Sequence, residues 1–398
     1  MKQGWEIKKL GEVCNFVRGP FGGSLKKNIF KTDGFAVYEQ QHAIYDQFDK
    51  VRYFIDEKKF NEMKRFEVNP GDLIMSCSGT MGKIAIVPKN IRMGIINQAL
   101  LKLRPTKNLL GVFLKLWMQS ERFQDSLKEY SGGAAIQNVA SVAILKQIEI
   151  QLPVLKVQQR IVSILDKAFA AIDKAKDNAE QNLKNAQELF DSYLQSVFKN
   201  KGYDWEEKKI IDITTQLGDG LHGTPKYTDN GEYYFINGNN LSNGKIIFKE
   251  NTKRVSEFEY EKYKKNLNKR SILVSINGTL GNVAFYNNEK IILGKSACYF
   301  NLKENIDKYY IKYFMSSPYF FNYAHKEATG ATIKNVSLKS MRDFNVPVPS
   351  IKTQQAIVQK LDSLSAETKR LEAIYKKKIE DLEELKKSIL QKAFSGEL

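Results

Sequence analysis

Two long amphipathic stretches stand out in the pattern of apolar and polar positions along the chain. In the first, from Val157 to Phe198, apolar residues recur in steps of four and three with one extra step of four, which defines a heptad seam with a single stutter. Its members are Ile161, Leu165, Ala168, Ile172, Ala175, Ala179, Leu183, Ala186, Phe190, Tyr193 and Val197. The second stretch, from Thr353 to Phe394, has a comparable seam in which Thr368 stands at an apolar position. Its apolar members are Ile357, Leu361, Leu364, Leu371, Tyr375, Ile379, Leu382, Leu385 and Ile389.

The two stretches predict helices of roughly 60 Å each. Neither contains a proline or a glycine, and both are rich in residues of high helix propensity. A single helix cannot bury a stripe this long in water, and each stretch has one partner of matching length. An ordinary core helix would also carry such a stripe, but the repetition favours an antiparallel coiled coil about a pseudo-two-fold axis, with the turn near Tyr375 opposite Asn178.

The repetition extends over the whole chain. Residues 1–200 align with residues 201–398, and the offset drifts only from 200 to 196. The matches are Trp5, Lys8 and Lys9 with Trp205, Lys208 and Lys209; SGTMG (78–82) with NGTLG (277–281); GAAIQNV (133–139) with GATIKNV (330–336); LPVLKVQQRIVSILD (152–166) with VPSIKTQQAIVQKLD (348–362); and LFDSYLQSVF (189–198) with LKKSILQKAF (385–394). Each half is therefore one globular domain followed by one long helix.

These patterns predict the α+β class, with two tandem α/β domains joined by a long antiparallel two-helix coiled coil in a pseudo-two-fold repeat. We expect a first domain at 1–155, a first helix at 156–201, a second domain at 202–351 and a second helix at 352–398. Pro153 should end the first domain, because the residue before a proline avoids the helical region. Gly202 should terminate the first helix.

Composition narrows the class further. The chain has 398 residues, a mean hydropathy of −0.42 and no apolar run approaching the roughly 18 residues of a membrane span. Met1 is followed by a polar, charged segment, so we expect no signal peptide. The three cysteines, Cys14, Cys77 and Cys298, lie far apart and outside any paired spacing. A reduced, cytoplasmic protein fits best.

Most of the formal net charge of +17 belongs to the two domains. Residues 1–155 hold 23 Lys and Arg against 15 Asp and Glu, and residues 202–351 hold 21 against 16, whereas the helical stretches are nearly balanced. An excess of this kind creates a field that attracts a polyanion, although a basic protein without such a partner would have the same composition.

The first domain contains a glycine-rich loop and two glutamines with the chemistry of base recognition. Gly4–Val13 should be a strand or turn, and Asn15–Leu25 a loop that ends at Lys26 and Lys27. The EQQHA motif then supplies Gln40 and Gln41. Glutamine amides pair with adenine, and Lys or Arg with guanine or phosphate. The region fits a groove-reading loop and, equally, a solvated surface.

Asn69–Val87 predicts two strands joined by a glycine turn, in which Gly79 and Gly82 supply positive φ angles. The phosphate-loop signature fails here, since Cys77 takes the place of its first glycine and Ile84 follows the lysine. The turn is therefore structural, with Ser78 and Thr80 placed to lie near DNA. Gly111–Tyr130 predicts one helix with a core-facing side formed by Phe113, Leu116, Trp117, Phe123 and Leu127.

The second domain repeats this plan with different loops. Gln216–Asn240 takes the place of the first glycine-rich loop but shares almost no residues with it. Two copies of one scaffold with divergent basic loops are expected if each copy reads a different ligand.

At the level of motifs, the chain resembles the specificity subunit of a type I restriction-modification enzyme. The residues that carry the resemblance are PVLKVQQRIVSILD from Pro153, PSIKTQQAIVQKLD from Pro349, the turns SGTMG and NGTLG, and the ending ILQKAFSGEL from Ile389. The resemblance spans the whole chain. One departure from the internal repeat is Asn97–Gln98, which aligns with Lys295–Ser296.

The resemblance implies that each domain is a target-recognition domain for one half of a bipartite double-stranded DNA site, with the helices setting the spacing. It also implies two methyltransferase subunits as partners, restriction subunits that join through them, and no membrane. S-adenosylmethionine, ATP and Mg²⁺ would belong to those partners, with no cofactor on this chain. The DNA-binding candidates are Arg18, Lys26, Lys27, Gln40, Gln41, Arg52, Arg65, Ser78, Thr80, Lys226, Tyr227, Asn239, Lys253, Arg254, Asn277, Thr279 and Lys295.

Catalysis by this chain itself is not expected. An adenine methyltransferase needs a [DN]PP[YF] motif, and the sequence contains no Pro-Pro pair. His42, His222 and His325 are scattered and have no repeat counterparts, which supports neither a metal site nor a hydrolytic triad. The alternative from another class is a coiled-coil adaptor that binds proteins without reading DNA.

Overall fold

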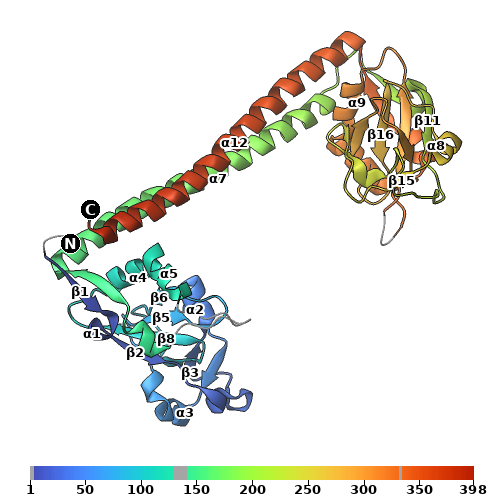
Figure 1. The fold of residues 1–398 in the computed structure, drawn as a ribbon. Coiled ribbons are helices and arrows are strands. Elements are labelled where there is room, and N and C mark those ends of the chain that lie inside the picture. The colour runs from blue at the N-terminus through green and yellow to red at the C-terminus, as the bar shows by residue number, and fades with distance from the viewer. Residues whose placement is uncertain (1–3, 130–140, 331–333) are drawn as a thin grey trace. The chain divides into compact units, whose positions relative to one another are not determined.

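The computed structural model describes residues 4–129, 141–330 and 334–398, which form two compact units (Figure 1). Unit 1 contains Met1–Ala179 and Lys377–Leu398, and unit 2 contains Glu180–Lys376. The boundaries between the units fall inside the two long helices, α7 (Leu155–Lys199) and α12 (Ile351–Ser395). The division into four segments at 155, 201 and 351 stays a prediction, but the two 45-residue helices confirm both amphipathic stretches.

The globular part of unit 1 is built on three small sheets. Its strands are β1 (Trp5–Lys9), β2 (Cys14–Arg18), β3 (Phe35–Tyr38), β4 (Tyr53–Ile55), β5 (Leu73–Ser76), β6 (Ile84–Ile86), β7 (Gly94–Ile96), β8 (Leu100–Pro105) and β9 (Glu149–Pro153). The sheets have the orders β1-β9, β2-β8-β5-β6 and β4-β3-β7. All neighbours are antiparallel except β3 and β7, which run parallel. The apolar run of β5 is buried throughout, as expected for a strand covered on both faces.

Short helices connect and cover these sheets. They are α1 (Leu10–Val13), α2 (Gln40–Tyr45), α3 (Glu57–Glu62), α4 (Gly111–Gln119), α5 (Glu121–Glu129) and α6 (Val142–Leu145), with 3-10 turns η1 (Gly22–Leu25), η2 (Lys27–Ile29) and η3 (Lys64–Phe66). The single helix predicted for Gly111–Tyr130 is wrong, because Ser120 has extended backbone and separates α4 from α5. The predicted core side of that segment is buried at all five positions.

Unit 2 repeats the same topology, which confirms the tandem duplication. Its strands are β10 (Glu206–Lys209), β11 (Thr214–Asp219), β12 (Tyr233–Ile236), β13 (Leu241–Ser242), β14 (Lys245–Ile246), β15 (Arg254–Val255), β16 (Ser271–Ser275), β17 (Val283–Phe285), β18 (Ile291–Leu293), β19 (Ala297–Leu302) and β20 (Asn345–Val348). The orders β10-β20, β11-β19-β16-β17 and β15-β12-β18 match those of unit 1, and β12 runs parallel to β18. The hairpin β13-β14 is an addition where unit 1 has α2.

The short helices and 3-10 turns of unit 2 are η4 (Ile210–Ile213), η5 (Gly238–Asn240), α8 (Glu257–Tyr263), α9 (Lys308–Met315), α10 (Pro318–Glu327) and α11 (Leu338–Asp343). The predicted loops are corrected in part. Asn15–Leu25 begins within β2 and ends in η1. Gln216–Asn240 begins within β11 and also contains β12 and η5. The predicted glycine turn is confirmed, with φ of +64° at Gly79 and +74° at Gly82 between β5 and β6. The GAAIQNV motif lies outside the described residues, as does part of GATIKNV.

Within unit 1, the first part of α7 packs antiparallel against the last part of α12. Two ion pairs join them, Lys176 Nζ to Glu383 Oε1 at 2.6 Å and Lys386 Nζ to Asp173 Oδ1 at 2.7 Å. From the first pair to the second, the position moves back three residues in α7 and forward three residues in α12. The two helices are therefore antiparallel, as predicted. The register differs from the prediction, since the same steps place Asp381 and not Tyr375 opposite Asn178.

The seams of the two helices are buried much as the heptad pattern predicts. Ile161, Leu165, Ile172, Ala179 and Ala186 are buried in α7. In α12, Thr368 is only 3% exposed, because its hydroxyl donates to the carbonyls of the preceding turn and leaves no polar hydrogen unpaired. Leu385 was predicted to lie in the buried seam, but its side chain is exposed.

Each helix is joined to the domain before it by a buried glutamine. Gln158 has no exposed surface, accepts from Leu110 N at 2.9 Å and donates to Asn108 O and Pro153 O at 2.9 and 2.8 Å. Gln354 repeats this in unit 2 with Asp307 N, Asn305 O and Pro349 O. The first glutamine of each QQ motif is therefore structural.

The far end of each helix enters a domain core through a phenylalanine. Phe394 of α12 packs on Phe113 of α4 in unit 1, at 5.2 Å between ring centroids. Phe198 of α7 packs on Phe314 of α9 in unit 2, at 5.0 Å. These contacts explain the repeated LQ-x-x-F ending. The helix α7 ends at Lys199, and Gly202 has no positive φ, so the prediction that Gly202 caps the helix is wrong.

The three cysteines are buried single thiols. Burial raises the pKa of Cys14, Cys77 and Cys298 to about 12 in each case, which keeps them protonated and unreactive near neutral pH. In the part of the chain that the structure describes, no helix is long and apolar enough to cross a membrane.

Replacement of Gln158 by alanine should destabilise unit 1 by about 3 kcal/mol, because the amide of Leu110 and two carbonyls would lose the partner that this buried side chain supplies. The matched control is Gln159→Ala, since Gln159 is exposed on the next position of the same helix. Thermal unfolding measures the stability, and hydrogen exchange at Leu110 reports the joint directly. Equal effects of the two substitutions would contradict a structural role for Gln158.

Candidate nucleic-acid interface

The carboxyl ends of the parallel strands β3 and β7 form the frame of the candidate site in unit 1. Tyr38 pairs with Ile96 at the end of the two strands, and Asn97 N donates to Tyr38 O at 2.9 Å. The next residues, Glu39 and Asn97, therefore leave the sheet side by side. Gly19 lies against this edge so closely that a Cβ there would meet Asn97 O at 1.8 Å. Carboxyl edges of parallel strands are common places for ligand contacts.

An open pocket of about 420 Å³ lies at this edge. Four of the predicted DNA-binding residues line it, together with residues that were not selected from the sequence. The lining is Glu39, Gln40, Gln41, Arg52, Ser78, Gly79, Asn97 and Ala99. Gln40, Gln41 and Ser78 make no side-chain hydrogen bond to any described residue, so their polar groups are available to a ligand.

Glu39 and Arg52 form an ion pair at the rim of the pocket. Arg52 Nη2 lies 3.3 Å from Glu39 Oε1, and the guanidinium also lies 4.5 Å from the centre of the Tyr53 ring. The Arg52 side chain is 65% exposed, whereas that of Glu39 is 17% exposed. Among the described residues, Glu39 Oε2 is the one buried side-chain oxygen or nitrogen without a hydrogen-bond partner. Such a group is costly and calls for a functional explanation.

The backbone that carries Glu39 is held by His42. Glu39 N donates to His42 Nδ1 at 2.9 Å, and His42 Nε2 lies 3.1 Å from Lys50 O. Both ring nitrogens are thus used inside a side chain that is 1% exposed. His42 positions the first turn of α2 and is not free to bind a ligand.

The other candidates of unit 1 lie outside the pocket lining. Arg18, at the end of β2, reaches the Cys77 thiol, where its charge and hydrogen bond oppose the larger effect of burial on the pKa of that thiol. Thr80 is exposed in the glycine turn beside Ser78. Lys26, Lys27 and Arg65 are exposed.

Unit 2 has the same frame with different side chains. Ile236 pairs with Leu293 at the end of the parallel strands, so Asn237 takes the place of Glu39 and Gly294 that of Asn97. Gly294 N donates to Ile236 O, as Asn97 N does to Tyr38 O. The sequence alignment at this point was wrong by one residue, since Asn97–Gln98 correspond to Gly294–Lys295. Repeats with short strands slip easily when only sequence is compared.

The candidates Asn239, Asn277, Thr279 and Lys295 follow the corresponding strand ends of unit 2. Asn239, Thr279 and Lys295 are exposed. Asn277 has a structural contact as well, because its Nδ2 donates to Asn335 Oδ1 at 3.1 Å.

A second group of candidates gathers at the edge strand β15. Tyr227 forms a bridge to Val255, and Lys253 Nζ lies 5.9 Å from the centre of the Tyr227 ring. Arg254 lies over the ring of Tyr234 at 5.2 Å. Lys226, whose backbone donates to Glu259 Oε2, precedes Tyr227. The group presents cations on aromatic rings, an arrangement suited to phosphates and bases.

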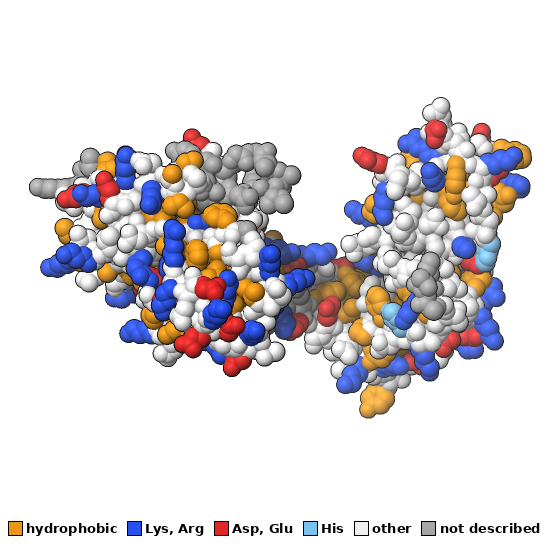
Figure 2. All heavy atoms as spheres, turned by 90° about the horizontal axis from the view of Figure 1, so that it is seen from below, with side chains coloured by type: hydrophobic (Ala, Val, Ile, Leu, Met, Phe, Trp, Pro, Cys, Tyr) orange, Lys and Arg blue, Asp and Glu red, His pale blue; other side chains and the backbone are white. Residues whose placement is uncertain are grey.

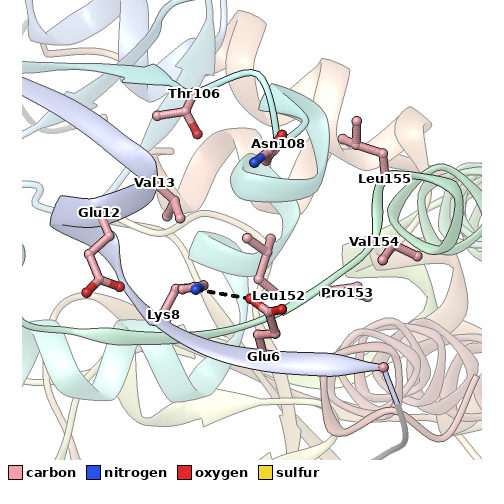
Figure 3. A pocket seen from close by; sticks show the side chains of 11 residues that line it. Glu6, Lys8, Glu12, Val13, Thr106, Asn108, Leu152, Pro153, Val154 and Leu155 are labelled. Carbon is pink, nitrogen blue, oxygen red and sulfur yellow. Dashed lines mark ion pairs between the residues drawn. The ribbon is translucent and has the colours of Figure 1, made fainter.

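A different pocket, of about 520 Å³, lies where β1 and β9 meet the start of α7 (Figure 3). Glu6 and Lys8 form an ion pair of 3.0 Å across it, and Glu206 and Lys208 repeat that pair in unit 2 at 2.8 Å. None of the predicted DNA-binding residues lines this pocket. It contains Asn108, whose carbonyl accepts from Gln158, so it belongs to the joint between domain and helix.

Basic side chains do not gather into a single stripe on the face shown in Figure 2. On the face shown in Figure 2, Lys and Arg side chains are spread over each unit with Asp and Glu between them. The local arrangement of side chains, more than total charge, distinguishes the site.

Glu39, Asn97 and Tyr53 were not predicted as site residues from the sequence. Glu39 and Asn97 each directly follow a short apolar strand, and the paired strand ends are the signal that would have identified them. Nothing in the local sequence shows that Arg52 and Glu39, thirteen residues apart, form an ion pair.

A family model for the type I restriction modification DNA specificity domain matches residues 2–184 and 203–381. The type I restriction enzyme EcoKI specificity subunit of Escherichia coli (strain K12) is 23% identical to the chain over 428 residues, which cover 100% of this chain and 90% of that protein. The MjaVIII specificity subunit of Methanocaldococcus jannaschii is 22% identical over 427 residues, covering 99% of this chain and 93% of that protein.

Two solved structures have the same fold over the full chain. The crystal structure of the HsdS subunit from Thermoanaerobacter tengcongensis has a TM-score of 0.69 at 18% identity, with 100% of this chain and 98% of the other covered. A structure that describes complex assembly and conformational transition of the type I R-M system has a TM-score of 0.75 at 17% identity, with 100% and 99% covered. These similarities show that the fold is shared.

The close approach of Gly220 to the strand ends of unit 2 should not tolerate a side chain. A Cβ at Gly220 would meet Gly294 O at 2.2 Å, whereas one at Gly223 would meet nothing within 4 Å. We expect Gly220→Ala to lower the free energy of unfolding by about 2 kcal/mol or more, and Gly223→Ala to change it little. Urea unfolding of the two variants compares them. A neutral Gly220→Ala would show that the strand ends are not held in this way.

Proposed function

Since the chain belongs to the type I restriction modification DNA specificity family, we propose that each of its two domains reads one half of a bipartite site in double-stranded DNA. The observation that carries the proposal is the repeated frame at the parallel strand ends. It presents Glu39, Gln40 and Gln41 in unit 1, and Asn237 and Asn239 in unit 2. Side chains with amide and carboxylate groups distinguish bases in the major groove.

The basic candidates supply the part of binding that does not depend on sequence. Lysine and arginine contacts to phosphates fix the register of a protein on the duplex, and base contacts then specify the sequence. In this proposal the cations that approach phosphates are Arg18, Lys26, Lys27 and Arg65 in unit 1, and Lys226, Lys253, Arg254 and Lys295 in unit 2.

The helices have a different task in the proposal. They set the length of the non-specific gap between the half-sites, and the buried glutamine and phenylalanine contacts at their ends support this by fixing each helix to a domain. The chain would also provide the surface on which two methyltransferase subunits assemble, with restriction subunits joining through them. S-adenosylmethionine, ATP and Mg²⁺ would be bound by those partners, and this chain would be their non-catalytic specificity subunit.

Salt dependence separates this function from that of a protein-binding adaptor. For the complex with its methyltransferase subunits, the logarithm of DNA affinity should fall linearly with the logarithm of salt concentration, with a slope of about −0.9 for each neutralised phosphate. Fluorescence anisotropy with a labelled duplex measures the slope. A flat response would favour the adaptor and remove the DNA-reading proposal.

Insertion of one heptad into both helices tests whether the helices set the gap length while the domains read the bases. Seven residues placed after Asn178 in α7 and after Glu380 in α12 preserve both seams, because these positions face each other in the antiparallel register. The insertion lengthens the pair by about 10 Å, or roughly three base pairs. We expect methylome sequencing of cells that express the variant with its methyltransferase to show unchanged half-sites and a longer gap. An unchanged gap, or changed bases within a half-site, would contradict the proposed roles.

A further inference from the structure

The ion pair at the rim of the unit 1 pocket presents hydrogen-bond donors and acceptors in an order that complements one base pair. Arg52 presents a fork of N–H donors, and Glu39 presents carboxylate acceptors immediately beside it, at 3.3 Å. In the major groove, a G·C pair presents the two acceptors N7 and O6 of guanine followed by the N4 amino donor of cytosine. Donors next to an acceptor on the protein therefore match acceptors next to a donor on the DNA.

The same pattern disfavours the other base pairs. An A·T pair presents an acceptor, a donor, an acceptor and a methyl group in order across the groove. A guanidinium placed on adenine would meet the N6 amino group, and a carboxylate placed on thymine would meet the O4 acceptor. Each would leave a charged group unpaired at the interface, which is the costly arrangement.

The pair is poised for a ligand and is not saturated within the protein. Glu39 Oε1 accepts from Arg52, but Glu39 Oε2 has no partner in the described part of the chain. The terminal torsion of a glutamate side chain is broad, so the carboxylate can rotate to offer this oxygen to a donor at the pocket. Arg52 has only Glu39 and the Tyr53 ring as partners among the described residues, which leaves most of its donors in solvent.

Unit 2 has no such ion pair at the equivalent described position. Asn237 replaces Glu39, and its Oδ1 accepts from Ser296 Oγ at 2.9 Å, so it is already satisfied. Ser296 Oγ in turn accepts from Gly238 N at 2.8 Å. The Glu39–Arg52 pair is therefore a property of the first domain and not of the repeated frame, as expected of a feature that distinguishes the two half-sites.

From this geometry, and on the basis of the proposed function, we infer that Arg52 and Glu39 together read one G·C base pair in the half-site of the first domain. Arg52 donates to guanine O6 and N7, and Glu39 accepts from the N4 amino group of the paired cytosine. Gln40, Gln41 and Ser78 face the neighbouring positions of the same pocket.

The test is methylome sequencing of cells that express the chain with its methyltransferase subunits, for the unchanged protein and for three variants. Glu39→Gln removes the carboxylate charge and leaves the side chain's size unchanged. Arg52→Lys retains the positive charge but removes the two-pronged donor geometry. Glu62→Gln is the matched control, because Glu62 is an exposed glutamate of the same domain that pairs with Lys59 outside the pocket.

We expect Glu39→Gln and Arg52→Lys to reduce selectivity by about tenfold or more at one and the same G·C pair, in one half-site. The Glu39→Gln variant should then accept the pair in which adenine replaces the cytosine and thymine replaces the guanine, because a glutamine amide pairs with adenine and thymine O4 still accepts from Arg52. All other positions and the second half-site should be unchanged, which also shows that the variants fold and assemble. Glu62→Gln should leave the motif unaltered.

Different failures have different meanings. Loss of selectivity at two separate positions, or at a pair other than G·C, would overturn the joint reading by Arg52 and Glu39. An unchanged motif in Arg52→Lys would overturn it as well, since a lysine cannot reproduce the rigid two-pronged contact of an arginine with guanine O6 and N7. If the unchanged protein directs no bipartite methylation, the proposed function itself fails.

Discussion

The joint between a strand and the helix that follows it is the constraint on which the rest of the structure depends. Gln158 and Gln354 each pair three backbone groups through a fully buried side chain, so a small rotation of the helix start would leave polar groups unpaired. Hydrogen bonds are directional, and packing of an apolar helix alone would not resist such a rotation as strongly. The joint thus gives the helix a defined direction relative to its own domain.

A second constraint acts at the recognition end of each domain. Gly19 and Gly220 bring backbone against the ends of the parallel strands at distances that no side chain permits. Backbone hydrogen bonds from Asn97 N to Tyr38 O and from Gly294 N to Ile236 O complete this frame in both copies. Residues at such positions can differ between the two copies without loss of the fold. The structure therefore separates stability, which resides in the frame, from the side chains that can carry specificity.

The sequence predicted what depends on periodicity and repetition. The long helices, their antiparallel direction, the duplication and the turns at Gly79 and Gly82 follow from local patterns that repeat over many residues. Features that depend on contacts distant in sequence were not predictable. The exposed Leu385, the register that places Asp381 opposite Asn178, and the break at Ser120 are decided by tertiary packing. Likewise, four of the predicted site residues meet in one pocket only because β3, β4, β5 and β7 bring them together.

The two domains also differ in how completely their polar groups are satisfied. In unit 2, Asn237, Ser296 and Gly238 form a closed set of hydrogen bonds at the strand ends. In unit 1, the equivalent Glu39 keeps a buried oxygen without a partner, a departure from the rule that the rest of the described chain obeys. Selection for stability alone would replace this glutamate with a residue such as the asparagine of the other copy. Since the frame is the same in both, the unsatisfied carboxylate marks a position where the local requirement is a ligand and not the fold.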